Sequence, residues 1–311
     1  MRYLVGTRGS QLSLAQTNWV ISELEKKSTQ TEFELVPIKT KGDTDARPLF
    51  TINQKGIFEK EIDRAVAERK VDFAVHSLKD VPADLPEELV LACIPKREAT
   101  NDVFISKNGQ TLNSIKKGAI IGTSSLRRAV QITRIRPDVI VKPIRGNIET
   151  RIKKVSDGIF DAIVLAEAGI GRLGLAVKFE KLSTDNFSPS PGQGALAIVA
   201  RRDNSELIDL LKKIEDPTSR NAVEAERSLS LFVDSGCRFP VGALAEQKEN
   251  RLTLTVTVYS VDGTKSIMVK KESEASGAKD LGKQVAYELS AKGIQELAKN
   301  WREKVEEWNK I

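Results

Sequence analysis

The chain has 311 residues, of which 40% are hydrophobic and 30% are charged, so it can form two or three domains with ordinary globular cores. A net charge of +6 is too small to indicate a nucleic-acid binder, and no apolar run approaches the ~20 residues of a membrane span. Two cysteines and one histidine exclude a disulfide framework and a multi-histidine zinc site. The N-terminal sequence does not have the shape of a signal peptide, so we expect a cytoplasmic protein.

The first hundred residues alternate between strand-like and helix-like segments. Helical spacing of apolar residues predicts helices over 12–24 and 55–70. This alternation is typical of a parallel sheet covered by helices. The predicted strands cover 3–6, 33–40, 71–76 and 89–95, and the second helix is predicted to bury Ile57, Phe58, Ile62 and Val66.

A second unit of the same kind begins near Thr100. Helices are predicted over 124–135, stopped by Pro137, and over 147–155. A loop rich in proline and glycine then leads into a strand at 195–201, which needs a sheet to join and can return to the first unit. The strands predicted for the second unit cover 119–122, 139–144 and 160–166.

The last third of the chain has a different pattern. A helix is predicted over 221–233, followed by two alternating strands around the turn signal Asp262-Gly263. The remaining ~35 residues have helical spacing. This combination indicates a small α+β domain. Its predicted core positions are Leu252, Leu254, Val256, Val258, Val285, Leu289, Ile294, Leu297 and Trp301.

Six arginines and only two acidic residues lie between Ile121 and Arg151. The sequence "GTSS" joins a predicted strand to a helix whose first turn holds Arg127 and Arg128, and "RGN" repeats the arrangement with Arg145 and Arg151. Backbone N–H groups at a helix N-terminus attract anions, and guanidinium groups bind carboxylates and phosphates with two hydrogen bonds. The repeated arrangement favours an anion site over a solvated basic face. Arg134 and Arg136 lie towards the helix C-terminus, where a structural role is the simpler interpretation.

Two further turns follow predicted strands. Arg8 and Ser10 lie between the first strand and the first helix, where Ser10 is also an ordinary N-cap residue. Lys79 and Asp80 follow the strand that ends at His76. Asp80 is either a general acid, a general base or a stabiliser of positive charge, or it belongs to a capped turn before Pro82. His76 is interpreted as a satisfied core histidine.

The two cysteines have different surroundings. Cys237 lies in a loop with Gly236 and Arg238, where a lowered pKa would make its thiol a nucleophile. The alternative for Cys237 is a small buried apolar residue. Cys93 lies inside a predicted strand and is interpreted in that second way.

Taken in order, these segments resemble the hydroxymethylbilane synthases, also called porphobilinogen deaminases. The resemblance extends over essentially the whole chain, and no single motif decides it. The matching stretches are "TRGSQLSLAQ", "KGIFEKE", "AVHSLKDVP", "GTSSLRR", "RGNIETR", "AEAGIGRLG", "PGQGALAI" and "SGCRFPVGA".

The resemblance implies an enzyme that joins four porphobilinogen molecules head to tail, releases four ammonia molecules and yields linear hydroxymethylbilane for tetrapyrrole (haem) biosynthesis. It implies two α/β domains like those of type II periplasmic binding proteins, and a small C-terminal α+β domain. The first domain would comprise 1–97 with 195–215, the second 98–194, and the third 216–311. We expect a monomer that acts on a small molecule, without a metal, a nucleic acid or a membrane as partner.

The resemblance also assigns residues. Asp80 would be the catalytic aspartate, and Cys237 would carry a dipyrromethane cofactor through a thioether. The cofactor and growing chain, which are polycarboxylates, would be held by Ser77, Lys79, Thr123, Ser125, Arg127, Arg128, Arg145, Gly146, Arg151 and Gln193. Arg8, Ser10, Lys55 and Arg172 would face incoming substrate or the elongating chain.

Two other interpretations remain open at this point. A two-domain anion receptor that has lost its export signal would explain the arginines, but it explains neither Cys237 nor the third domain. A basic nucleic-acid binder predicts aromatic residues for stacking among the arginines, and residues 122–151 contain none.

Overall fold

The first α/β unit is built on a five-stranded sheet with the order β2-β1-β3-β10-β4. The computed structural model describes residues 1–40, 59–233, 240–298 and 303. In this sheet β1 is parallel to β2 and β3, whereas β10 is antiparallel to β3 and β4. Strand β10 therefore arrives from the opposite direction, after the chain has passed through the second unit. The strands are β1 (Arg2–Arg8), β2 (Glu32–Ile38), β3 (Phe73–Ser77), β4 (Leu89–Cys93) and β10 (Leu196–Arg201).

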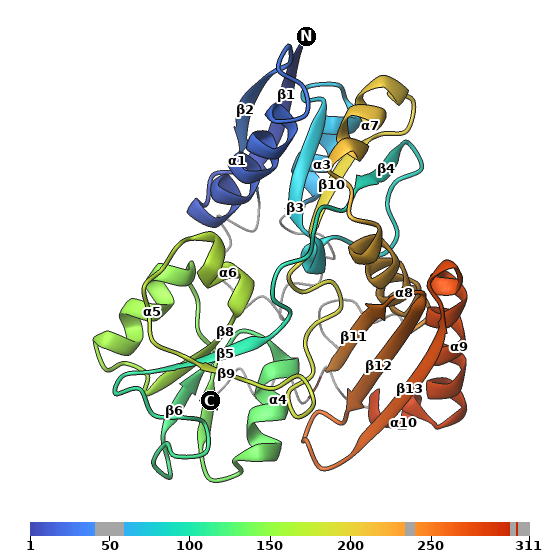
Figure 1. Cartoon of the computed structure of the whole chain (residues 1–311). Helices are drawn as coiled ribbons and strands as arrows, with labels where there is room; N and C mark the ends of the chain where they lie inside the picture. The colour runs from blue at the N-terminus through green and yellow to red at the C-terminus, as the bar shows by residue number, and fades with distance from the viewer. Residues whose placement is uncertain (41–58, 234–239, 299–302, 304–311) are drawn as a thin grey trace.

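Helices cover both faces of this first sheet (Figure 1). Phe73 and Val75 of β3 pack on the face covered by α1 and α7, while Ala74 packs with α3 on the other face. This alternation follows from the two-residue repeat of a strand. Ser10 caps α1 by accepting a hydrogen bond of 3.2 Å from the backbone N–H of Ser13. The helices are α1 (Gln11–Glu25), α3 (Lys60–Ala67) and α7 (Ser205–Leu211).

The second unit repeats the arrangement with the order β7-β6-β8-β5-β9. Strand β6 is parallel to β7 and β8, and β5 is antiparallel to β8 and β9. Ile132 of α4 packs on one face, and Val155 of α5 and Ile170 of α6 pack on the other. The elements are β5 (Asp102–Ser106), β6 (Ile120–Gly122), α4 (Leu126–Ile135), β7 (Ile140–Lys142), α5 (Ile148–Ser156), β8 (Ala162–Ala166), α6 (Glu167–Arg172) and β9 (Glu180–Lys181).

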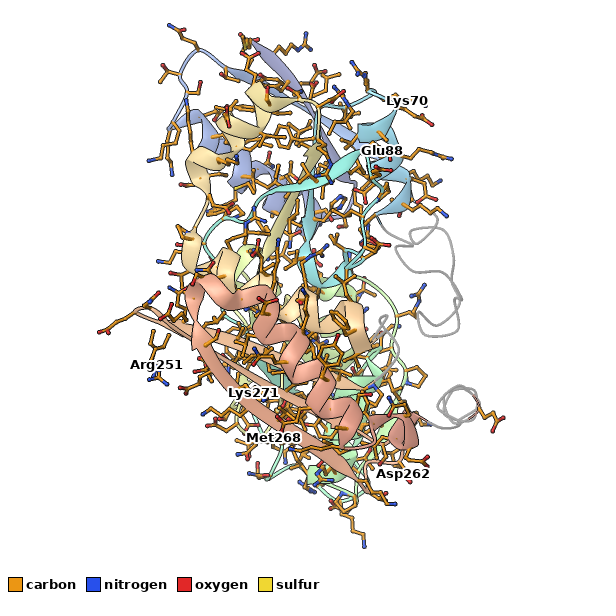
Figure 2. The ribbon with its side chains drawn as sticks, turned by 90° about the vertical axis from the view of Figure 1, so that its right-hand side faces the viewer. Lys70, Glu88, Arg251, Asp262, Met268 and Lys271 are labelled. Atoms are coloured by element: carbon orange, nitrogen blue, oxygen red, sulfur yellow. The ribbon has the colours of Figure 1, made fainter. Side chains whose placement is uncertain are left out.

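The third unit is an antiparallel sheet, β11-β12-β13, with helices α8 and α9 packed against it. In Figure 2 this unit faces the viewer, with Arg251 labelled at the start of β12 and Asp262 in the turn between β12 and β13. The positions predicted to share a face, from Leu252 to Val258, are fully buried in its core. The elements are α8 (Pro217–Val233), β11 (Val241–Lys248), β12 (Arg251–Tyr259), β13 (Ser266–Glu274), α9 (Ala278–Ala291) and α10 (Ile294–Ala298).

The predicted fold class is confirmed, since two α/β units of matching strand order are followed by a small α+β unit. Several elements differ from their prediction. The sequence pattern did not predict β5 or β11, and β11 contains glycine and alanine, which have low strand propensity. Helix α8 begins four residues earlier than predicted, at Pro217, a residue suited to the first helical position.

The C-terminal helical segment is interrupted rather than continuous. Gly293 has φ of +82°, a left-handed conformation that separates α9 from α10. Val285, Leu289, Ile294 and Leu297 are buried, as predicted. Ile62 and Val66 are buried as well, whereas Ile57, Phe58 and Trp301 lie outside the described residues.

The three units contact one another through buried groups. Helix α1 of the first unit lies against α6 of the second, and Tyr259 of β12 packs with Leu126 and Val130 of α4. Glu226 of α8 is fully buried and accepts two hydrogen bonds from Arg97, of 2.8 and 3.0 Å. Within the described parts of the chain, no helix has the length and apolar character needed to cross a membrane.

Candidate active site

Lys79 and Asp80 lie in a single 3₁₀ turn (Leu78–Asp80) that directly follows β3. The turn is anchored by Leu78, which is 2% exposed and whose N–H donates to the Ala195 carbonyl at 3.0 Å. Both polar side chains are half-buried. The sheet edge thus presents an ammonium and a carboxylate side by side, at the carboxyl end of a strand, where α/β proteins bind ligands.

Arg127 and Arg128 are buried, with side chains 6% and 8% exposed, and both bind the fully buried carboxylate of Asp102. Nη2 of Arg127 lies 2.8 Å from Oδ2 of Asp102. Nε and Nη2 of Arg128 donate to Oδ1 at 2.9 and 2.7 Å. The cations at the start of α4 therefore have an internal anion, supplied by the first residue of β5.

Gln193 connects this cluster to the loop before β10. Its Nε2 donates to the Thr100 carbonyl at 2.7 Å and to Oδ1 of Asp102 at 3.0 Å. Its own carbonyl accepts a hydrogen bond of 2.8 Å from Nε of Arg97, which also binds Glu226. Gln193 is fully buried. It lies in the segment that returns to the first α/β unit, and its hydrogen bonds to Thr100 and Arg97 join it to the segment that leaves that unit.

The charges around Lys79 affect its protonation. Burial lowers the pKa of Lys79 to about 8, opposed by Asp80 and Asp102 and assisted by Arg128 and Arg127. These residues come from both α/β units. Leu78 of the 3₁₀ turn donates to the Ala195 carbonyl, two residues after Gln193, which binds Asp102, so the turn and the Asp102 cluster belong to one site.

Arg151, in the first turn of α5, extends the basic region. Burial lowers the pKa of Arg151 to about 10, and the charges of Arg128 and Arg145 act in the same direction. Gly146 has φ of +114°, and its carbonyl accepts a hydrogen bond of 2.7 Å from Nε of Arg151. An anionic ligand would stabilise the charge of Arg151, which burial, Arg128 and Arg145 disfavour.

Hydroxyl groups lie at the ends of the strands around this region. Ser77, the last residue of β3, accepts a hydrogen bond of 2.9 Å from Nε2 of Gln16. Thr123 is fully buried, and its Oγ1 accepts a hydrogen bond of 3.2 Å from the Ser125 N–H. Ser125 caps α4 by accepting from the N–H of Arg128 at 3.4 Å.

The predicted substrate-facing residues are spread more widely. Arg8 ends β1 and Ser10 caps α1. Arg172 ends α6 and donates a hydrogen bond of 2.7 Å from Nη2 to the Gly194 carbonyl, next to Gln193. Burial lowers the pKa of Arg172 to about 10. Lys55 and Cys237 lie outside the described residues.

Three structural interpretations from the sequence are confirmed. His76 is 5% exposed and bonds Asp63, and Cys93 is a fully buried free thiol whose pKa is raised by burial. Arg134 and Arg136 bind backbone carbonyls, and Arg136 also pairs with Asp138.

The residue that sequence reasoning missed is Asp102. The local sequence shows only an acidic residue directly before a short apolar run, and an aspartate in that position is also typical of a turn.

The donor set suits a polycarboxylate rather than a metal. Two carboxylates, Asp80 and Asp102, lie among an excess of cations. Among the residues that the structure describes, no group of three or more His, Cys, Asp or Glu side chains could hold a metal ion. The cations of this site are Lys79, Arg127, Arg128, Arg145 and Arg151.

Comparison with known proteins relates the chain to one family of enzymes. Residues 3–209 match the family model of the porphobilinogen deaminase, dipyromethane cofactor binding domain, and residues 221–291 match that of the porphobilinogen deaminase C-terminal domain. A probable porphobilinogen deaminase of Nitrosopumilus maritimus is 68% identical over 310 residues, which is 100% of each chain. The porphobilinogen deaminase of Desulforamulus reducens is 43% identical over 300 residues, which is 96% of this chain and 97% of that protein.

Solved structures give weaker similarity. A methionine binding protein, MetQ, has 12% identity and a TM-score of 0.43, with 68% of this chain and 89% of that one covered. A periplasmic binding protein of Salmonella typhimurium with high arginine specificity has 13% identity and a TM-score of 0.40, covering 70% and 93%. The strand order of the two sheets is the better basis for assigning the fold.

The chain belongs to the porphobilinogen deaminase family. It is a transferase of tetrapyrrole biosynthesis that uses a dipyrromethane cofactor and polymerises four porphobilinogen molecules into linear hydroxymethylbilane with release of ammonia.

Proposed function

We propose that Asp80 is the catalytic carboxylate of this reaction and that the cations around it hold the acetate and propionate groups of cofactor, substrate and growing chain. The observation that supports this most is the charge balance of the site. A half-buried carboxylate lies beside Lys79. The charges of Arg127 and Arg128 act on Lys79, and those of Arg128 and Arg145 act on Arg151.

Asp80 is suited to stabilise positive charge. The pyrrole nitrogen of porphobilinogen becomes electron-poor as ammonia leaves the aminomethyl group, and a fixed carboxylate near it stabilises that charge in a partly dehydrated site. The new carbon–carbon bond then forms, and the α-carbon that attacked loses a proton. Asp80 can take this proton, since it is anchored on a short turn and half-open to the site.

The basic residues divide into two groups by their surroundings. Lys79, Arg145 and Arg151 are half-buried and would bind ligand carboxylates directly. Arg127 and Arg128 are already bound to Asp102, so their contribution would come from their charge and from the hydrogen-bond donors that remain. Ser77, Thr123, Ser125, Gly146 and Gln193 would shape the same cofactor-binding wall.

Arg8, Ser10, Lys55 and Arg172 are assigned to incoming substrate. Arg172 ends a helix and donates to the Gly194 carbonyl through Nη2, and further N–H groups of its guanidinium group would be offered to a carboxylate. Cys237 is assigned as the attachment residue through a thioether. A dipyrromethane attached there would supply the first two rings of the chain and a free α-carbon for the first addition.

Further proposals concern organisation and location. We propose domains at 1–97 with 195–215, at 98–194 and at 216–311; the return of β10 to the first sheet supports the discontinuous first domain. We also propose a cytoplasmic monomer that acts on porphobilinogen, with no nucleic-acid or membrane partner.

The role of Asp80 is tested by Asp80→Asn. We expect turnover to be nearly abolished, while the thermal unfolding midpoint and the reaction of the cofactor with Ehrlich's reagent stay as in the wild type. Asp84→Asn is the matched control, since Asp84 is an exposed carboxylate four residues further on. Normal turnover in Asp80→Asn would remove Asp80 from this role.

A further inference from the structure

Helix α8 of the third unit packs against the turn that carries Asp80. Val223 of α8 is fully buried and belongs to one apolar cluster with Leu78 and Val81. These two residues lie on either side of Lys79 and Asp80 in the chain. The third unit therefore helps to hold the 3₁₀ turn, in addition to the first sheet from which the turn emerges.

Arg227 of α8 binds the chain just after the turn. Its Nη2 donates hydrogen bonds of 3.0 Å to the Pro82 carbonyl and 2.9 Å to the Ala83 carbonyl. Both carbonyls lie in the connection 81–88, which forms neither helix nor strand before β4. Hydrogen bonds from a charged donor are stronger than those between neutral groups. Arg227 thus fixes the exit of the turn where secondary structure does not.

Glu226, the preceding residue, fixes α8 itself. Besides binding Arg97, its fully buried carboxylate accepts hydrogen bonds from the N–H groups of Gly192, at 2.6 Å, and Ala245, at 2.8 Å. Arg97 lies in the segment that leaves the first α/β unit, Gly192 in the segment that returns to it, and Ala245 in β11. The position of α8 is consequently set by both α/β units and by its own sheet.

These contacts come from one face of the helix, because Val223, Glu226 and Arg227 are spaced at i, i+3 and i+4. Helix α8 continues to Val233, which precedes Cys237 by four residues in the sequence. Six residues of helix separate Arg227 from Val233, a rise of about 9 Å. The helix face that holds the turn and the helix end that leads to the proposed attachment residue are therefore parts of one short rigid element.

We propose that Arg227 is a positioning residue for the reaction: by holding the carbonyls of Pro82 and Ala83, it sets the position of Asp80 relative to the pyrrole chain attached at Cys237. The inference rests on the proposed roles of Asp80 and Cys237. A displacement of about 1 Å between reacting groups can slow a reaction about 100-fold. Loss of Arg227 should therefore slow the catalytic step rather than weaken ligand binding.

Arg227→Met tests this, since it removes the donors and keeps an unbranched apolar side chain. In the holoenzyme kcat should fall at least about tenfold, while KM for porphobilinogen stays within about threefold and the reaction of the cofactor with Ehrlich's reagent is kept. Arg227→Lys retains a charged donor and should restore kcat to within about threefold of the wild type.

Arg220→Leu is the matched control. Arg220 lies on the same helix and also donates to a carbonyl of the first unit, that of Leu91 in β4, at 3.2 Å from both Nη1 and Nη2. Its loss should lower the thermal unfolding midpoint without lowering kcat. Hydrogen exchange of the backbone N–H groups at 78–83 should accelerate in Arg227→Met and not in Arg220→Leu. This readout is independent of turnover.

A double variant shows whether Arg227 acts through Asp80. The rate of the first addition is followed in Asp80→Asn by rapid quenching and mass spectrometry of the enzyme–substrate complexes. If Arg227 acts by placing the Asp80 carboxylate, adding Arg227→Met should slow this residual rate by less than about twofold. A general structural effect would instead repeat the full fall seen with Asp80 present.

Unchanged kcat in Arg227→Met, unchanged exchange at 78–83, or a full further fall in the Asp80→Asn background would overturn the proposal. Arg227→Gln takes the place of Arg227→Met, with the same expectations, if the methionine variant does not fold. Normal turnover in Asp80→Asn would overturn the catalytic role of Asp80. That result comes from the single variant, so the two failures are distinguished.

Discussion

Asp102 neutralises Arg128 through two hydrogen bonds of 2.9 and 2.7 Å to one oxygen, while its other oxygen lies 2.8 Å from Arg127. The carboxylate is fully buried and the two guanidinium groups are nearly so. Two arginines in the first turn of α4 would oppose the helix dipole without such an anion. Arg127, Arg128 and Asp102 together carry a net charge of +1, so the cluster still attracts an anionic ligand.

Asp102→Asn should therefore destabilise the protein strongly. Removing one partner of a buried ion pair typically costs about 3–5 kcal/mol, because the remaining charges are left buried and unpaired. Urea unfolding at pH 7 measures this loss. Asp138→Asn is the control, since Asp138 is partly exposed where it pairs with Arg136 and its loss should change the free energy of unfolding far less. Equal losses in both variants would contradict the assignment.

The contribution of Asp102 should disappear in acid. Burial acts to raise the pKa of Asp102, but the charges and hydrogen bonds of Arg127 and Arg128 outweigh it and hold the pKa below its ordinary value. A carboxylate with a lowered folded-state pKa contributes stability above its unfolded pKa of about 3.9, and the contribution is lost as pH falls through the folded pKa. The difference in unfolding free energy between wild type and Asp102→Asn should thus shrink below about pH 3.9. A constant difference would contradict it.

Lys79 should give the enzyme an alkaline limit. Its pKa of about 8 means that the ammonium group loses its charge above that pH, and with it a partner for ligand carboxylates. The kcat/KM for porphobilinogen should fall above pH 8 in the wild type, whereas in Lys79→Arg the fall should begin at higher pH because guanidinium stays charged. Lys70→Arg, an exposed lysine in Figure 2, should leave the profile unchanged. Coincident profiles for wild type and Lys79→Arg would exclude this role.

Arg145 and Arg151 should matter more for ligand binding than for folding. Arg151→Leu removes a charge that burial and two neighbouring arginines already disfavour, so stability should change by less than about 1 kcal/mol. Cofactor loading or chain elongation should nevertheless drop, by about tenfold for each lost carboxylate pair. Loading is measured with Ehrlich's reagent and elongation by mass spectrometry of the enzyme–substrate complexes. Arg251→Leu, at the exposed end of β12, is the control.

Both five-stranded sheets could be predicted in outline from the sequence, because short apolar runs and helical spacing alternate along the first 200 residues. The turns at Arg8, Asp80, Arg127 and Arg145 were also predictable, since each follows such a run. The pairing of Arg128 with Asp102 was not, because it joins residues 26 positions apart and depends on β5 running antiparallel to β8. Local pattern carries no information on which distant acid neutralises a given arginine.

The burial of Glu59 could not be predicted from the sequence either. In the sequence it is one acidic residue in a charged helix segment, which usually indicates a solvated face. Its burial follows from the packing of α3 against β3 and β10. Hydrophobic spacing located Ile62 and Val66 correctly, but it gave no signal that Glu59 is buried as well.

The most direct test of the account is the intact mass of the purified protein. We predict an excess over the polypeptide mass equal to two deaminated porphobilinogen units, lost in Cys237→Ser and kept in Cys93→Ser, since Cys93 is fully buried. A bare polypeptide mass that stays unchanged after incubation with porphobilinogen, or an adduct that survives Cys237→Ser, would contradict the account.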